Sequence, residues 1–515
     1  MLRAPVAGLC VVVFSSWLAA TCGGGDGVPN EATTVSSLWG TAGEQWVRGG
    51  RLTDFSYAGY HRGERPLPRL LTDVGVTDFG AVGDGTKDDT AAIQRAVSAS
   101  PGKVIGIPAG RYVISDVIEL THNGTVLQGA GPENTVLFAP KPLEHIRPNM
   151  GATTTGRPTS NYSWSGGIIR AVGRWDDTPL AEVTAQSRRG DNTLEVDRPD
   201  RLEIGDLVRL VLQDDSAFSL TRHLYADDPG DVDNLKRVRE EWIARIVAID
   251  LVTKHVTLDR ALRTDVRLEW RPVLYSARST VEEVGIEELA IEFPVTPYGG
   301  HFTELGFNAI ALGGVHNGWV RNVEIRHADS GIFISGANNT ITGVRWTSQR
   351  QRDRRRNSTG HHGITLGGSD QLLSDFDFRT KFIHDVTMSR GSAGNVVRDG
   401  RGEDLTFDHH CYANHANLFT NVDAGVGTDI FRSGGGAKLG RHCGAWTTWW
   451  NIKTERPVEV PAGWATDMIN VVGVLSEAES VTEPNGRWFE VIAPERLTPP
   501  DLYESQWERR LRPER

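Results

Sequence analysis

Short apolar triplets separated by polar turns recur along the second half of the chain, and each predicts a β-strand. Their spacing is regular: 21 residues separate Val323 from Val344, Phe376 from Val397 and Val386 from Phe407, and 22 separate Val397 from Phe419. Strands that repeat at this period indicate a solenoid, because no single coil could bury its apolar face alone. The fold predicted is all-β, a right-handed parallel β-helix.

The region before these repeats predicts a cap. From Val76 the pattern is strand, glycine loop and short helix, with Asp88 or Asp89 as N-cap and Pro101 after the last helical turn. The glycines of the loop do not form a phosphate-binding motif, because Lys87 is followed by two aspartates rather than by a hydroxyl residue. We expect this helix to cap the N-terminal end of the solenoid.

Residues 144–277 alternate apolar and polar positions over longer runs, as at 202–210 and 243–249. This pattern is typical of antiparallel strands and predicts a small β subdomain inserted between coils. Residues 51–143 then form the cap and first coils, and 278–515 form the main solenoid with a C-terminal cap that includes a helix at 502–511. Three tryptophans at 446, 449 and 450 either close the core or stack on sugar rings.

The first 22 residues have the pattern of a targeting signal. A basic residue, Arg3, precedes an apolar run at 6–18 that is too short to span a membrane, and Ala19, Ala20, Thr21 and Cys22 follow. Cys22 is therefore a candidate lipidation site, and ordinary secretory cleavage is the alternative. Residues 23–50 read as a flexible tether, so we expect an exported envelope lipoprotein or a periplasmic or extracellular protein that meets a membrane only through a lipid.

Composition limits the partners. The net charge is −11, from 55 basic and 66 acidic residues, which argues against nucleic acid as the main partner. Six arginines nevertheless lie between 345 and 356, on a loop that would either grip an anionic polymer or be a solvated turn. Cys411 and Cys443 would remain after export and are expected to form one disulfide.

Three motifs carry a resemblance to a known family: DFGAVGDGTKDDTAAIQ at 78–94, VIGIPAGRY at 104–112 and TVLQGAG at 125–131. Together they resemble the opening of parallel β-helix proteins of the pectate lyase superfamily, in the rhamnogalacturonase/epimerase-like group. The resemblance implies a β-helix with a helical cap. It does not imply one reaction, since the same opening serves hydrolases, lyases, epimerases and phage tail spikes.

Ionisable residues crowd at 381–442, which the period divides into about three coils. Stacked strands lie about 4.8 Å apart, so residues one coil apart share a face. The catalytic candidates are His384, Asp385, Arg401, Glu403, Asp404, Asp408, His409 and His410. The substrate-binding candidates are His361, His362, Arg398, Arg432, Lys438 and Arg441.

These residues suit two reactions. In β-elimination from a uronate, a histidine removes the C5 proton while arginine, lysine or Ca²⁺ held by acidic residues neutralises the carboxylate. In glycoside hydrolysis, two of the carboxyl groups act as acid and as base or nucleophile. Of the polygalacturonase site motifs only Gly-His-Gly has a near match, at 360–363. We expect an acidic-polysaccharide lyase, with a glycoside hydrolase and a non-catalytic carbohydrate-binding protein as alternatives. A zinc site is not expected, because no CxxC spacing occurs and His409 and His410 point to opposite faces of a strand.

Overall fold

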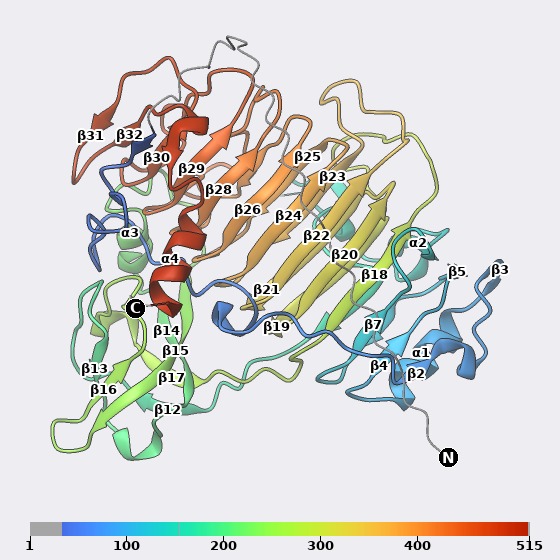
Figure 1. Cartoon of the computed structure of the whole chain (residues 1–515), viewed down its shortest axis with the longest axis horizontal. Coiled ribbons are helices and arrows are strands. Elements are labelled where there is room, and N and C mark those ends of the chain that lie inside the picture. The colour runs from blue at the N-terminus through green and yellow to red at the C-terminus, as the bar shows by residue number, and fades with distance from the viewer. Residues whose placement is uncertain (1–32, 154, 513–515) are drawn as a thin grey trace, which may run out of the picture.

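Two parallel sheets, stacked coil by coil, form the body of the molecule (Figure 1). The computed structural model describes residues 33–153 and 155–512, so the expected signal sequence and Cys22 lie outside the described residues. One sheet has seven strands: β6 (Ile118–Leu120), β11 (Ile169–Val172), β19 (Asn308–His316), β21 (Ser330–Ala337), β23 (Gly360–Leu366), β25 (Phe382–Met388) and β27 (Phe407–His409). The predicted right-handed parallel β-helix is confirmed.

The other sheet has 16 strands. Its path runs through β2 (Val74–Gly75), β4 (Val104–Gly106), β7 (Val126–Gln128), β18 (Gly285–Glu292), β20 (Trp319–Arg326), β22 (Thr340–Thr347), β24 (Leu372–Phe378), β26 (Val396–Gly402), β28 (Leu418–Asp423), β29 (Thr448–Lys453), β30 (Asn470–Val474), β32 (Trp488–Glu490) and β31 (Val481–Thr482). A branch adds β3 (Asp84–Asp88), β5 (Gly110–Val113) and β8 (Thr135–Phe138).

The coil spacing read from the sequence gives the true register for some strands but not for all, because Val397 of β26 pairs with Leu373 of β24 and not with Phe376. Val386 pairs with Phe407 and Val397 pairs with Phe419 in neighbouring parallel strands. The apolar residues of successive coils, with 0% exposure at Val386, Phe407 and Phe419, form one continuous core. Side-chain amides stack at a turn as well, since Nδ2 of Asn339 donates to Gln371 at 3.0 Å.

Eight consecutive strands of the larger sheet, from β18 to β30, each bend at one residue. The bend residues have positive φ and occupy equivalent positions on successive coils: Glu288 (57°), Asn322 (49°), Gly343 (65°), Asp375 (49°), Asp399 (49°), Asn421 (51°), Asn451 (57°) and Gly473 (68°). Most are Asn, Asp or Gly, the residues that tolerate this left-handed conformation best. The bend makes the outer face of the sheet concave.

Short helices and the predicted cap lie at the N-terminal end. Helix α1 (Thr90–Ala99) covers the first coils with Ile93 and Val97, both fully buried, as the sequence predicted. Two shorter helices, α2 (Leu143–Ile146) and α3 (Ser219–Leu224), lie in connecting segments. The 3-10 helices are η1 (Tyr60–Gly63), η2 (Val76–Phe79), η3 (Asn161–Ser163), η4 (Pro199–Arg201), η5 (Leu268–Trp270) and η6 (Pro494–Arg496).

The inserted subdomain begins later than predicted. Residues 144–172 belong to the solenoid and its loops, because β11 pairs with β6 and β19; a small hairpin, β9 (Met150–Ala152) with β10 (Pro158–Ser160), precedes it. The insert has six strands: β12 (Pro179–Glu182), β13 (Thr193–Glu195), β14 (Leu207–Gln213), β15 (Arg239–Asp250), β16 (His255–Leu258) and β17 (Val273–Ser276). They pair antiparallel around their own core, as predicted.

The two ends of the described chain pack together. Helix α4 (Leu502–Leu511), predicted from the sequence, lies along the side of the larger sheet, where Leu502 and Trp39 share one apolar cluster (Figure 1). Strand β1 (Thr34–Val35) pairs with β33 (Leu497–Thr498). The expected tether is therefore wrong for residues 33–50, because buried Trp39 and Leu38 hold this segment against the C-terminal residues. No helix among the described residues is long and apolar enough to cross a membrane.

Candidate active site

Histidines gather on the smaller sheet at consecutive coils. His361 and His362 lie in β23 and His384 lies in β25, where His362 and His384 pair in register. Asp408 follows one coil later in β27, beside Thr387, and His410 comes directly after that strand. The ring centres of His362 and His384 are 5.1 Å apart, and those of His384 and His410 are 6.2 Å apart. The coil period thus brings together five residues that the sequence predicted for the site.

Asp408 connects these groups. Its Oδ2 accepts a hydrogen bond from Nδ1 of His410 at 3.0 Å and one from Oγ1 of Thr387 at 3.1 Å, and lies 3.5 Å from Nδ1 of His384. Its Oδ1 accepts from the amide of Gly434 at 2.7 Å. The carboxylate is fully buried, whereas the His410 side chain is 39% exposed. Asp408 therefore fixes His410 by Nδ1 and leaves Nε2 as its free acceptor.

The surroundings shift the pKa values of these histidines in different directions. Burial raises the pKa of Asp408, but the nearby His384 and His410 outweigh it and lower that pKa far below its usual range. Burial opposes protonation of His410, yet the charge of Asp408 raises the pKa of His410 above its ordinary value. Burial lowers the pKa of His384 to about 4 and that of His361 and His362 well below 6.5. Within the cluster, the pKa of His410 is thus raised, whereas the pKa values of His361, His362 and His384 are lowered.

A loop before β19 adds two residues that the sequence analysis missed. His301 lies 4.5 Å from His361 between ring centres, and burial lowers its pKa to about 3. Oε1 of Glu304 lies 3.6 Å from Nδ1 of His361, and Glu304 also accepts hydrogen bonds from Ser163 and Tyr298. Burial raises the pKa of Glu304 to about 7. This loop does not repeat at the coil period. In the sequence, only the presence of a histidine and a glutamate among glycines could have marked it as part of a site.

Arginines surround the histidine cluster, which comprises His301, His361, His362, His384 and His410. The positive charges of Arg356, Arg157 and Arg432 each lower the pKa of His301. Burial, and after it the charge of Arg356, lowers the pKa of Arg432 itself. Among the described residues neither Arg356 nor Arg432 has a side-chain ion pair at 4.0 Å or less, in contrast to Arg350 and Arg352 of the same loop. Two cations without carboxylate partners can receive an anionic ligand.

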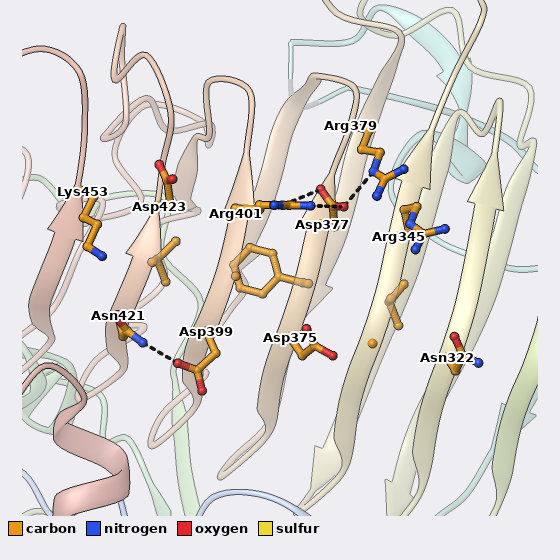
Figure 2. Close-up of a pocket in the computed structure, with 15 residues that line it drawn as sticks. Asn322, Arg345, Asp375, Asp377, Arg379, Asp399, Arg401, Asn421, Asp423 and Lys453 are labelled. Carbon is orange, nitrogen blue, oxygen red and sulfur yellow. Dashed lines mark hydrogen bonds and ion pairs between the residues drawn. The ribbon is translucent and has the colours of Figure 1, made fainter. Parts of the chain in front are cut away.

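The larger sheet carries a different surface, the outer groove, along the bend of its strands (Figure 2). The groove has a volume of about 620 Å³ and places Arg401, predicted as catalytic, far from the histidine cluster on the other sheet. Some of its charges are paired: Arg401 and Arg379 both bind Asp377, at 3.1 and 2.8 Å, and Asn421 donates to Asp399 at 2.6 Å. Asp375, Asp423 and Lys453 also line the groove and make no ion pair at 4.0 Å or less with another described residue.

Three predicted carboxyl groups make hydrogen bonds or ion pairs outside the histidine cluster. Asp385 accepts from the amides of Phe382 and Thr406 at 2.8 and 2.9 Å and joins adjacent coils, although burial raises its pKa to about 7. Glu403 pairs with Arg352 at 2.6 Å, and Asp404 pairs with Lys381. Of the four carboxylates proposed for hydrolysis, Asp408 alone contacts the histidine cluster.

His409 points away from its neighbour His410. It is fully buried, its Nδ1 bonds to Oδ1 of Asn414 at 2.7 Å, and its ring packs against Trp449 and Trp464. The tryptophans 449 and 450 are fully buried, so they close the core rather than offering a sugar platform. His409 therefore has a packing position in the structure.

The expected disulfide is wrong: both cysteines are free and buried. Sγ of Cys411 lies 3.4 Å from Nδ1 of His442, whereas Cys443 packs into the solenoid core. The other predicted binding residues are held by local ion pairs: Arg398 by Asp501 and Glu504, Lys438 by Asp233, and Arg441 by Asp228. Of the predicted cations, Arg432 lies at the cluster.

One group of described residues has the arrangement of a metal site. Single ligand atoms of His301, His361 and His384 all lie within 4.8 Å of one another. Three imidazoles suit zinc and related transition metals, whereas Ca²⁺ requires oxygen ligands. The residues 33–153 and 155–512 contain no comparable group of three or more carboxylates for the Ca²⁺ that β-elimination can use.

Comparison with known proteins agrees with the fold. Residues 74–153 match the family described as rhamnogalacturonase A/epimerase, pectate lyase-like. This segment of the chain is similar to the pectate lyase-like family. The match covers the cap and first coils, which contain the motifs on which the resemblance was based.

The curated relatives match this chain over short stretches. Mannuronan C5-epimerase AlgE4 of Azotobacter vinelandii is 35% identical over 99 residues, 18% of this chain and 18% of its own length. Plasmin and fibronectin-binding protein A of Streptococcus pneumoniae is 32% identical over 112 residues, 19% of this chain and 15% of its own. The tailspike protein gp49 of Pseudomonas phage LKA1 has a TM-score of 0.47 and 16% identity over 74% of this chain and 59% of its own.

The chain thus spans less than a fifth of the curated relatives it matches. One of these relatives is named as an enzyme and the other as a binding protein, so similarity to them does not identify a reaction. The histidine cluster lies outside the matched family segment, since its first member is residue 301.

Proposed function

We propose that this protein is an exported carbohydrate-active enzyme that cleaves an acidic polysaccharide by β-elimination. The observation that carries the proposal is the Asp408–His410 pair beside Arg356 and Arg432. A buried carboxylate orients an exposed imidazole, and two arginines without carboxylate partners lie at the same cluster. Base and cations together are what uronate elimination requires.

In this mechanism Arg432 and Arg356 bind the uronate carboxylate and stabilise the charge that develops on it. Nε2 of His410 removes the C5 proton, and the electron pair forms the C4–C5 double bond while the bond from C4 to the glycosidic oxygen breaks. The protonated His410 can return this proton to the departing oxygen. Asp408 stays ionised throughout, because its pKa lies far below neutral pH.

The hydrolase alternative has less support. Asp385, Glu403 and Asp404 make the hydrogen bonds and ion pairs described above, so substrate would have to break these contacts before using them. A non-catalytic binding protein does not need an imidazole that a buried carboxylate orients. The family match and the similarity to a mannuronan C5-epimerase are consistent with a polysaccharide partner.

The proposal is tested by incubating the full chain with acidic and neutral polysaccharides while reading ultraviolet absorbance and reducing ends together. A lyase produces both signals from a polyuronate, because each elimination creates an unsaturated uronate and a new reducing end. Reducing ends without absorbance would establish the hydrolase instead. Binding without either signal would establish a non-catalytic carbohydrate-binding protein. The export proposal rests on the sequence of residues 1–22 and is tested by determining the N-terminus and any lipid on Cys22 of the cell-derived protein.

A further inference from the structure

We propose that His301, His361 and His384 form a binding site for a transition-metal cation of the Zn²⁺ type. The three ligand atoms come from the loop before β19 and from the adjacent coils β23 and β25, and all lie within 4.8 Å of one another. Nitrogens that bind zinc at about 2.0–2.1 Å in a tetrahedral site lie about 3.3 Å apart. A modest inward movement of His301, which lies on a loop, would complete this geometry.

Two of the three imidazoles face carboxylates. Nδ1 of His361 lies 3.6 Å from Oε1 of Glu304, and Nδ1 of His384 lies 3.5 Å from Oδ2 of Asp408. Both nitrogens are buried and have no hydrogen-bond partner among the described residues. Carboxylates behind ligating histidines commonly fix the ring and leave Nε2 for the metal. A cation on Nε2 would make Nδ1–H more acidic and strengthen both contacts.

Charges of both signs lie near the three histidines. The charges of Arg356 and Arg432 oppose a cation at this place, while the carboxylates of Glu304 and Asp408 favour it. Ionised Asp408, which lies 3.5 Å from Nδ1 of His384, offsets part of the positive charge of the two arginines.

Three protein ligands would leave a fourth position open, as in catalytic rather than structural zinc sites. An anionic oxygen of a bound ligand is the group expected there, because the arginines lie at the same cluster. The inference concerns binding of the metal alone and does not depend on cleavage of any polysaccharide.

The test uses the full chain after treatment with a chelator. Zn²⁺ is titrated in competition with a chromophoric chelator, and Co²⁺ is added separately to record its visible spectrum. We expect one equivalent of metal per chain, a Co²⁺ spectrum of tetrahedral type, and X-ray absorption of the zinc form that shows imidazole nitrogens at about 2.0–2.1 Å. Ca²⁺ is expected not to compete.

The zinc affinity of variants shows which residues bind the metal. His301→Ala, on the loop, should weaken zinc binding at least tenfold, roughly the effect of disturbing a metal's immediate surroundings. His384→Asn should do the same, while the exposed His122→Ala should bind as the wild type does. Circular dichroism of each variant confirms folding. Absence of stoichiometric binding in the wild type, or unchanged affinity in folded His301→Ala, would overturn the proposal. Since no turnover is measured, this result is separate from that of the lyase assay.

Discussion

Nδ1 of His410 donates a hydrogen bond to Oδ2 of Asp408 at 3.0 Å, from a half-exposed ring to a fully buried carboxylate. This pair links the coil period to chemistry, because the solenoid places Asp408 one coil after Thr387 and next to His384. The same carboxylate holds His410 in one tautomer and raises its pKa. The proposed reaction depends on both effects.

Replacing Asp408→Asn should move the pH dependence of activity. Asp408 raises the pKa of His410, so its removal lowers that pKa, and the acidic limb of the pH–rate profile shifts to lower pH. Turnover also falls because the ring is no longer held. Initial rates measured between pH 4 and pH 9, at intervals of about half a pH unit, report both effects. Asp423→Asn, an exposed aspartate of the outer groove, should leave the limb in place. An unshifted limb in Asp408→Asn would contradict the pairing.

Arg432→Gln should weaken binding of an acidic polymer. Hydrogen bonds to charged groups contribute about 1.5–3 kcal/mol, so KM should rise about tenfold or more while the fold is retained. The matched control is Arg401→Gln, which removes an arginine from the outer groove and should change KM by less than about twofold. Equal effects of the two substitutions would show that the outer groove, and not the histidine cluster, receives the substrate.

Gly434→Ala should impair the site through space rather than charge. A Cβ at this position would lie 2.6 Å from Cε1 of His410 and 3.3 Å from Cε1 of His384, so at least one ring must move. We expect a large loss of turnover with little loss of stability. Gly313→Ala is the control, because its added methyl would have its nearest neighbours at 4.0 Å. If both variants were equally active, the rings would not be positioned as described.

His409 should affect stability and not catalysis. Burial lowers its pKa to about 4 in the folded protein, against about 6.5 in the unfolded chain. Between these pH values the unfolded state binds more protons, so stability falls as pH falls through that range. His409→Gln should remove this dependence, and its stability relative to the wild type should improve by up to about 1.4 kcal/mol per pH unit on acidification. Urea unfolding at several pH values measures this change, and parallel curves would refute it.

The sequence predicted the scaffold well for a physical reason. Apolar triplets must recur at the coil period if each coil is to cover the next, so Val386 and Phe407 revealed the register directly. The same register brought His384 and Asp408 onto neighbouring coils. What depends on strand stacking could be read from spacing alone.

The rest of the site depends on the path of loops and on the direction in which side chains point. His301 and Glu304 come from an aperiodic loop that folds over the sheet, so nothing in their spacing marked them. Glu403 and Asp404 were predicted because they lie just before residues 405–406, one coil after His384, but the turn after β26 directs them to Arg352 and Lys381. His409 is buried against Trp449 and not in the histidine cluster, and nothing in the sequence indicated this packing.

The central claim is that His410 removes a C5 proton from a uronate. The most direct measurement compares wild type with His410→Ala for formation of unsaturated uronate from the polyuronate that the panel identifies, with His122→Ala as control. We predict ultraviolet-absorbing product from wild type and control, and a loss of about 100-fold or more in His410→Ala, the usual contribution of a general base. Undiminished product formation by folded His410→Ala, or reducing ends without unsaturated product from the wild type, would contradict the account.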